Sequence, residues 1–152
     1  MNNKNNNFLS NGVCLVGIGR HMLSKIIPAL NNLEIPINGY VSSRKSLRKY
    51  NIVHFSSIKE ALTKTPKSSV FIIASPPENH FEQVETIANA GFDMFIEKPA
   101  FLTYKHAKCI NEIINSNNNI LCIELMVYLE NITFKKIFNN FFSHVKEIKS
   151  IQ

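Results

Sequence analysis

Val13-Cys14-Leu15-Val16-Gly17-Ile18-Gly19 is the stretch that decides the fold. Four apolar residues run without interruption into a glycine, which is typical of a short strand buried on both faces of a parallel sheet. Residues 20–31 carry apolar side chains at helical spacing, and Pro28 is predicted to kink that helix. A strand, a glycine turn and a helix in this order predict the first unit of an α/β domain.

The alternation of apolar strands and amphipathic helices continues along the whole chain. Further strands are predicted at residues 37–41, 51–55, 70–74, 94–96, 120–126 and 145–151. Helices are predicted at residues 43–50, 78–90, 104–115 and 131–142, and Thr103 can cap the third of these. Ser56 and Ser57 offer an N-cap for another helix after the third strand. This order predicts a doubly wound parallel sheet of the Rossmann type, in which ligands bind beyond the carboxyl ends of the strands.

Length and composition indicate a single globular domain. The chain has 152 residues, of which 45% are hydrophobic and 18% charged. Its apolar runs are shorter than the roughly 18 residues that a membrane span needs. Residues 1–11 are rich in Asn and lack the apolar stretch of a signal peptide, so we predict a disordered leader and a cytoplasmic protein.

The charged residues and the cysteines give little sign of nucleic-acid or metal binding. The net charge of +6 is spread along the chain, which favours a solvated surface over a nucleic-acid footprint and also suits a phosphate-bearing cofactor. Three cysteines and five histidines show no metal-ligand spacing. The cysteines lie in apolar stretches and are predicted to be buried free thiols.

Gly17 and Gly19 stand between a strand and a helix, as in a dinucleotide-binding fingerprint. The first glycine permits the tight turn, and the second lets the backbone approach a pyrophosphate at the helix N-terminus, next to Arg20. The third glycine of the fingerprint is replaced by Met22. Two glycines also suit any tight strand-to-helix turn, so this motif alone leaves both interpretations open.

The end of the second strand points to the kind of dinucleotide. It reads Val41-Ser42-Ser43-Arg44-Lys45, without the Asp or Glu that binds the ribose hydroxyls of NAD. Ser43 can donate to a 2′-phosphate, and Arg44 can pair with it and stack on adenine. We therefore expect NADP to be preferred over NAD, the alternative being a polar turn that opens a basic helix.

A longer pattern follows in residues 70–103. It contains Val70 to His80 (VFIIASPPENH), a helix closed by Gly91, Met94 to Pro99 (MFIEKP) and Thr103. This pattern resembles the Gfo/Idh/MocA family, the glucose-fructose oxidoreductase and inositol dehydrogenase group. In that family A-[ST]-P-x-x-x-H follows one strand and E-K-P ends the next. The resemblance extends from about residue 12 to the end of the chain and is much more specific than two glycines.

The resemblance implies hydride transfer between a nicotinamide dinucleotide and a sugar or cyclitol hydroxyl or ketone. Lys98 would be the catalytic residue, reaching both the nicotinamide ribose and the substrate hydroxyl. Glu97 would position the ribose, and Pro99 would follow a cis peptide. Tyr128 would contact substrate, with core packing as the alternative. The cofactor edge would be lined by Ser75, Pro76, Pro77, Asn79 and His80.

Residues 145–151 resemble the strand that opens the second domain of the family. The resemblance therefore divides the chain into a leader (1–11), a dinucleotide-binding domain (12–144) and the first strand of a missing α+β substrate domain (145–152). The family's Asp-x-x-x-His acid/base pair, which belongs to that second domain, does not occur here. We expect the cofactor half of an oxidoreductase, active on a sugar if completed in trans.

An unpaired strand at residues 145–151 would pair with a partner chain or with a second copy, forming a homo-oligomer. Two alternatives to an enzyme half remain open: a stand-alone NADP-binding module with a regulatory or scaffold role, and a catalytically inactive fragment.

Overall fold

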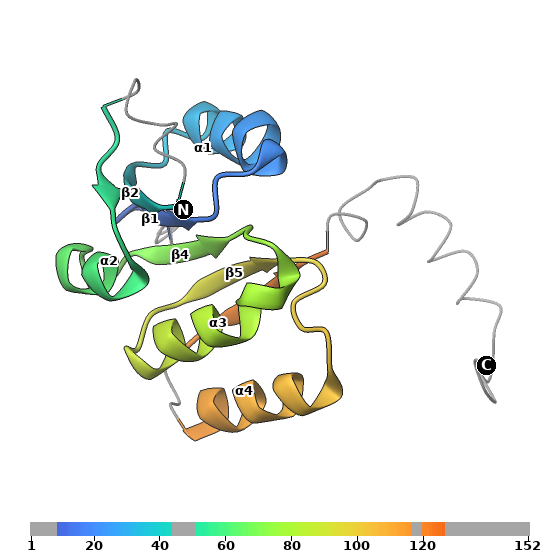
Figure 1. Cartoon of the computed structure of the whole chain (residues 1–152). Helices are drawn as coiled ribbons and strands as arrows, with labels where there is room; N and C mark the ends of the chain where they lie inside the picture. The colour runs from blue at the N-terminus through green and yellow to red at the C-terminus, as the bar shows by residue number, and fades with distance from the viewer. Residues whose placement is uncertain (1–8, 44–50, 117–119, 127–152) are drawn as a thin grey trace, which may run out of the picture.

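The computed structural model describes residues 9–43, 51–116 and 120–126. Six parallel strands form one sheet in the order β3-β2-β1-β4-β5-β6 (Figure 1). The strands are β1 (Val13–Val16), β2 (Ile37–Val41), β3 (His54–Phe55), β4 (Val70–Ile73), β5 (Met94–Glu97) and β6 (Cys122–Leu125). The predicted doubly wound parallel sheet is confirmed. Strand order reverses between β1 and β4, where ligands of such sheets bind.

Helices cover both faces of the sheet. The helical run after β1 consists of η1 (Met22–Ile26) and α1 (Ile27–Asn32) and lies on one face (Figure 1). The opposite face carries α2 (Ile58–Lys64), α3 (His80–Asn89), which follows the short turn η3 (Pro77–Asn79), and α4 (Tyr104–Ser116). Covering on both faces explains why the two central strands are apolar at every position instead of alternating.

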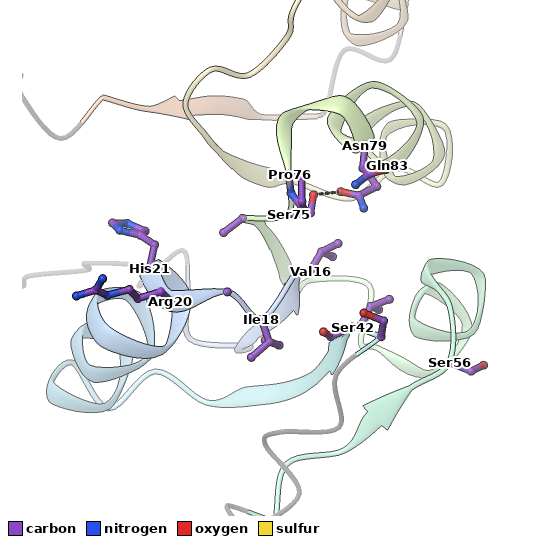
Figure 2. Close-up of a pocket in the computed structure, with 15 residues that line it drawn as sticks. Val16, Ile18, Arg20, His21, Ser42, Ser56, Ser75, Pro76, Asn79 and Gln83 are labelled. Atoms are coloured by element: carbon purple, nitrogen blue, oxygen red, sulfur yellow. Dashed lines mark hydrogen bonds between the residues drawn. The ribbon is translucent and has the colours of Figure 1, made fainter.

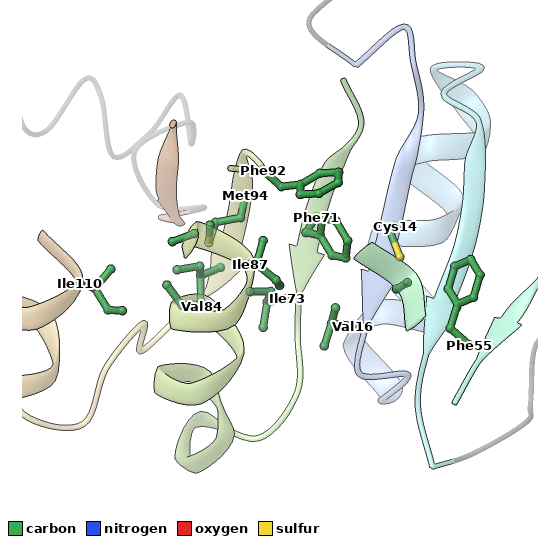
Figure 3. Packing of buried hydrophobic residues seen from close by; sticks show 13 residues of the cluster. Cys14, Val16, Phe55, Phe71, Ile73, Val84, Ile87, Phe92, Met94 and Ile110 are labelled. Atoms are coloured by element: carbon green, nitrogen blue, oxygen red, sulfur yellow. The ribbon is translucent and has the colours of Figure 1, made fainter. Parts of the chain in front are cut away.

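Two hydrophobic layers result, one on each face. Cys14 and Val16 of β1 point into the layer under α2, α3 and α4, whereas Val13 and Leu15 point into the layer under the first helix. Figure 3 shows the first layer, in which the rings of Phe71 and Phe92 meet edge to face with centroids 5.1 Å apart. Every residue of β1 and β4 is buried, so these two strands anchor the site that opens at their carboxyl ends.

The first helix begins with a wider turn just before Pro28. The five residues before α1 form a π-helical turn, in which the Ile27 N–H donates to the carbonyl of Met22. Proline has no N–H, and its ring crowds the carbonyl four residues earlier, that of Ser24, so an α-helical turn is not available there. Met22, which replaces the third glycine of the fingerprint, is fully buried at the start of this wider turn.

The predicted helix caps are present. Ser57 Oγ accepts the Glu60 N–H at 3.1 Å at the start of α2, and Thr103 Oγ1 accepts the His106 N–H at 3.2 Å at the start of α4. Gly91 follows α3 with a φ of +77°, the left-handed conformation expected after a helix C-terminus. These local patterns were readable because each involves only neighbours in the sequence.

Some predicted boundaries differ from the structure. The third strand is shortened to His54–Phe55. Residues 9–11, assigned to the leader from sequence, form a turn in which the Asn11 carbonyl accepts from Asn38 Nδ2 at 2.8 Å and Ser69 Oγ at 3.1 Å. The rest of the leader, the predicted helix at 43–50 beyond Ser43, the predicted helix at 131–142 and the predicted strand at 145–151 lie outside the described residues. None of the helices in the described ranges has the length and apolar character needed to cross a membrane.

The three free thiols differ in burial, which predicts an order of reactivity. Cys14 is fully buried, whereas Cys109 and Cys122 are only partly buried, so the prediction of burial is correct for one of the three. Burial raises the pKa of Cys14 to about 12 and that of Cys122 to about 11. Because the thiolate is the reactive form, we expect a thiol reagent at pH 8 to label Cys109 first and Cys14 last.

Mass spectrometry of peptides from the labelled protein measures this order. The same reaction in urea is the control, since all three thiols should then react at similar rates. Labelling of Cys14 as fast as Cys109 in the native chain would contradict the packing of β1.

Candidate functional site

A groove of about 670 Å³ lies at the carboxyl ends of β1 and β4 (Figure 2). This is the point where the strand order of the sheet reverses. Its lining comes from the β1–helix turn, the end of β2, the start of α2 and the segment after β4. The residues are Val16, Gly17, Ile18, Gly19, Arg20, His21, Val41, Ser42, Ser43, Ser56, Ala74, Ser75, Pro76, Asn79 and Gln83.

Gly17 is required by the packing of the protein itself. Its φ is +83°, and a Cβ placed on it would lie 2.5 Å from the backbone N and Cα of Ser75. Its N–H donates to the Val41 carbonyl at 2.9 Å, which joins the end of β1 to the end of β2. No side chain larger than hydrogen fits between these backbones, so Gly17 fixes the tight turn that opens the groove.

Gly19 has a different reason to be glycine. Its φ lies outside the left-handed region, and a Cβ placed on it would meet no protein atom within 4 Å. Folding therefore does not demand glycine at this position. Bare backbone on the wall of the groove is what a ligand needs for close approach, as a pyrophosphate does at the second glycine of a dinucleotide site.

The charges around the groove suit an anion. Arg20 and His21 line it at the first helical turn, and the groove has no carboxylate among its lining residues in the described ranges. The N-terminus of a helix carries unpaired N–H groups and a partial positive charge, so it favours phosphate oxygens. The described residues contain no group of three side chains that could hold a metal ion.

Hydroxyl groups gather at the far end of the groove. Ser42 and Ser56 lie on the side opposite Arg20 and His21 in Figure 2, and Ser43 joins them in the lining. These residues follow the ends of β2 and β3. Arg44, the predicted partner of a 2′-phosphate, and its neighbour Lys45 lie outside the described residues.

The segment after β4 forms a second wall with a fixed polar surface. Ser75 Oγ donates to Gln83 Oε1 at 2.6 Å, as Figure 2 shows, and Asn79 stands one helical turn before Gln83. Because Gln83 Oε1 accepts from Ser75, the amide group of Gln83 has one orientation. Its NH2 group is then directed away from Ser75 and is able to donate to a ligand.

His80 lies behind this wall and does not line the groove. It is fully buried, with Nε2 2.9 Å from the Ser75 carbonyl and Nδ1 3.1 Å from the Pro99 carbonyl. The ring therefore joins the loop after β4 to the loop after β5. Pro77 also stays outside the lining, so a direct cofactor contact by either residue remains a prediction from the resemblance.

The Glu97-Lys98-Pro99 segment begins at the carboxyl end of β5. Glu97 Oε1 lies 2.9 Å from His21 Nε2, which brings this segment to the Arg20–His21 end of the groove. The peptide bond between Lys98 and Pro99 is cis, as the resemblance implies. The next residue, Ala100, donates its N–H to Glu124 Oε1 of β6 at 2.9 Å, which holds the loop against the neighbouring strand.

The structure thus brings part of the predicted set together in one groove: Gly17, Gly19, Arg20, Ser43, Ser75, Pro76 and Asn79. Glu97 contacts His21 of the lining, and Lys98 and Pro99 follow Glu97 in the sequence. Tyr128 lies outside the described residues. Sequence reasoning missed Ser42, Ser56, His21 and Gln83. A rule that every polar residue just after a parallel strand is a candidate would have found the first two.

The fold and this groove define a class of protein. A parallel sheet of order 3-2-1-4-5-6, with an acid-free groove over a Gly-x-Gly turn at its switch point, is a dinucleotide-binding Rossmann domain. A family model described as "Oxidoreductase family, NAD-binding Rossmann fold" matches residues 12–125. The chain belongs to this family, the Gfo/Idh/MocA oxidoreductases. No curated protein matches the sequence as a relative.

Solved structures share the fold at low sequence identity. The WlbA dehydrogenase from Bordetella pertussis, solved in complex with NADH and UDP-GlcNAcA, is 17% identical with a TM-score of 0.77 over 87% of this chain and 42% of its own. The UDP-N-acetylglucosamine 3-dehydrogenase GnnA from Acidithiobacillus ferrooxidans is 17% identical, with a TM-score of 0.69 over 86% of this chain and 43% of its own. An oxidoreductase from Bacillus cereus is 17% identical, with a TM-score of 0.73 over 88% of this chain and 41% of its own.

The chain therefore spans about two fifths of the length of these proteins, from 41% to 43%.

Proposed function

We propose that this chain binds NADP(H) in the groove, in preference to NAD(H), and forms the cofactor half of an oxidoreductase. The single observation that carries the proposal is the groove over Gly19, where bare backbone, the first helical turn and an acid-free lining meet at the switch point of the sheet. The resident group that fits this donor set is a dinucleotide, with its pyrophosphate against Gly19 and Arg20.

The 2′-phosphate preference is supported at the other end of the groove. Ser42 and Ser43 follow β2, where NAD-selective domains place a carboxylate, and both line the groove. In the sequence Arg44 follows Ser43 directly, and a guanidinium pairs with phosphate through two parallel hydrogen bonds.

A sugar or cyclitol hydroxyl is the substrate class that we propose. Bound nicotinamide would supply the hydride chemistry. Lys98 would bind and orient the substrate hydroxyl, and Glu97 would bind the adjoining ribose. The named relatives of the same fold support a sugar, since one was solved with UDP-GlcNAcA and another is a UDP-N-acetylglucosamine dehydrogenase. The rest of the substrate pocket would come from a second domain beginning near residue 145.

Fluorescence titration of the 152-residue chain with NADPH and with NADH tests the cofactor proposal. We expect micromolar binding and a preference for NADPH, which Arg44→Asp reduces about tenfold because it places a carboxylate beside the 2′-phosphate. Arg48→Asp is the matched control, since it makes the same charge change in the same basic stretch and should leave the preference unchanged.

Equal binding of NADH and NADPH would overturn the assignment of Ser43 and Arg44. Failure of both nucleotides to bind would overturn the proposed function as a whole.

A further inference from the structure

The contact between His21 and Glu97 joins two segments that sequence motifs treat separately. His21 Nε2 and Glu97 Oε1 are 2.9 Å apart, within hydrogen-bonding distance. His21 stands on the first helical turn after Gly19, and Glu97 is the last residue of β5. The phosphate-binding turn is thereby tied directly to the segment that contains Lys98.

We propose that His21 is a positioning residue, which orients Glu97 and the adjoining Lys98 at the nicotinamide end of the groove. This inference rests on the proposed function and adds to it a residue that neither the glycine pair nor the E-K-P pattern contains. His21 acts through Glu97, so its effect should appear in how the second nucleoside is held.

The topology of the sheet assigns the two ends of the groove. A doubly wound sheet consists of two mononucleotide-binding halves, here β1 to β3 and β4 to β6, and a dinucleotide lies across their junction. The 2′-hydroxyl or 2′-phosphate of the adenosine ribose is recognised after β2, where Ser42 and Ser43 lie. Glu97 ends a strand of the other half, so the nicotinamide nucleoside belongs on its side.

The hydrogen bond between His21 and Glu97 can fix the orientation of the Glu97 carboxylate. An ionised carboxylate only accepts hydrogen bonds, so His21 Nε2 must carry the proton that is donated to Glu97 Oε1. Fixing Oε1 sets the plane of the carboxylate and leaves Oε2 to accept from a ribose hydroxyl. The His21 N–H also offsets part of the negative charge that Glu97 would otherwise present to the pyrophosphate.

The exposure of the His21 side chain indicates that this residue contributes little to folding stability. The His21 side chain is 50% exposed and that of Glu97 is 16% exposed, so the imidazole buries little area against the core. A polar contact this exposed adds little to folding stability. Loss of His21 should therefore change ligand binding while leaving the unfolding temperature close to that of the wild type.

Calorimetric titration with two ligands distinguishes the ends of the groove. NADPH contains the nicotinamide nucleoside, whereas 2′-phospho-ADP retains the adenosine and both phosphates of the bridge but lacks the second ribose and the nicotinamide. We expect His21→Leu to raise the Kd of NADPH about fivefold and to change the Kd of the fragment less than about twofold. His21→Gln should restore most of the affinity, because its amide can still donate to Glu97.

Lys25→Gln is the matched control, since it removes a positive charge one helical turn away on an exposed side chain. It should leave both Kd values unchanged. Combining His21→Leu with Glu97→Ala should weaken NADPH binding no more than Glu97→Ala alone, because His21 acts through the side chain that the second change removes.

Two results would overturn the inference while the proposed function stands. One is an equal loss of affinity for NADPH and the fragment in His21→Leu, which would make His21 a phosphate contact. The other is unchanged affinity for both ligands. If the wild-type chain binds neither ligand, the proposed function fails and this inference fails with it.

Discussion

Gly17→Ala is expected to destabilise the folded chain by about 3 kcal/mol or more, the largest loss that we predict for a single methyl group. The new Cβ would sit in a backbone with φ of +83° and lie 2.5 Å from the backbone of Ser75. The left-handed conformation contributes about 1 kcal/mol of this loss and the backbone clash the rest. Ser75 cannot move aside as a flexible side chain would, because the adjoining Ala74 N–H is bonded to the Val16 carbonyl.

Urea unfolding followed by circular dichroism measures this loss, with Gly91→Ala as the matched control. Gly91 has a similar φ of +77°, but a Cβ on it would meet nothing within 4 Å. The control therefore reports the conformational strain alone, about 1 kcal/mol. If both variants lose the same stability, the close approach of β1 and the segment after β4 at Gly17 is wrong.

Gly19→Ala should have the opposite profile, with stability retained and dinucleotide binding weakened by about tenfold to a hundredfold. A Cβ on Gly19 has open space around it within the protein, and a less flexible unfolded chain slightly favours folding. The methyl group would occupy the wall of the groove where a pyrophosphate approaches. Hydrogen bonds from backbone N–H groups to the phosphates would then be lengthened or lost.

Calorimetric titration with NADPH, beside a thermal melt of each variant, checks this prediction. Gly91→Ala again serves as the control, because it is remote from the groove lining and should bind as the wild type does. An unchanged Kd for Gly19→Ala would mean that no phosphate lies against this turn, and the orientation proposed for the ligand would have to be abandoned.

The fold was predictable from sequence because its determinants are local. Uninterrupted apolar runs such as 13–16 and 70–73 mark strands buried on both faces, and Gly17, Ser57 and Thr103 mark where turns and helices begin. The pattern in residues 70–103 that resembles the family could be recognised for the same reason, because its residues are close together in the sequence. The third strand was predicted too long because only His54 and Phe55 pair with β2, and nothing within the segment distinguishes paired from unpaired residues.

The site was predictable only in part because it is assembled from segments distant in sequence. His21 and Gln83 carry no motif, and their roles emerge only from a distance to Glu97 in one case and to Ser75 in the other. His80 shows the opposite case. Its place in a family pattern implies the cofactor edge, and only the structure shows that its ring lies between the backbone carbonyls of Ser75 and Pro99.

The buried ring of His80 has a consequence for how tightly the groove can hold a ligand. The loop after β4 lines the groove, and the loop after β5 adjoins it, since Glu97 contacts His21 of the lining. Because one imidazole touches carbonyls of both, at Ser75 and at Pro99, the two loops are preorganised before any ligand arrives. A dinucleotide entering such a groove removes less conformational entropy than one that must order two independent loops, so more of its contact energy appears as affinity.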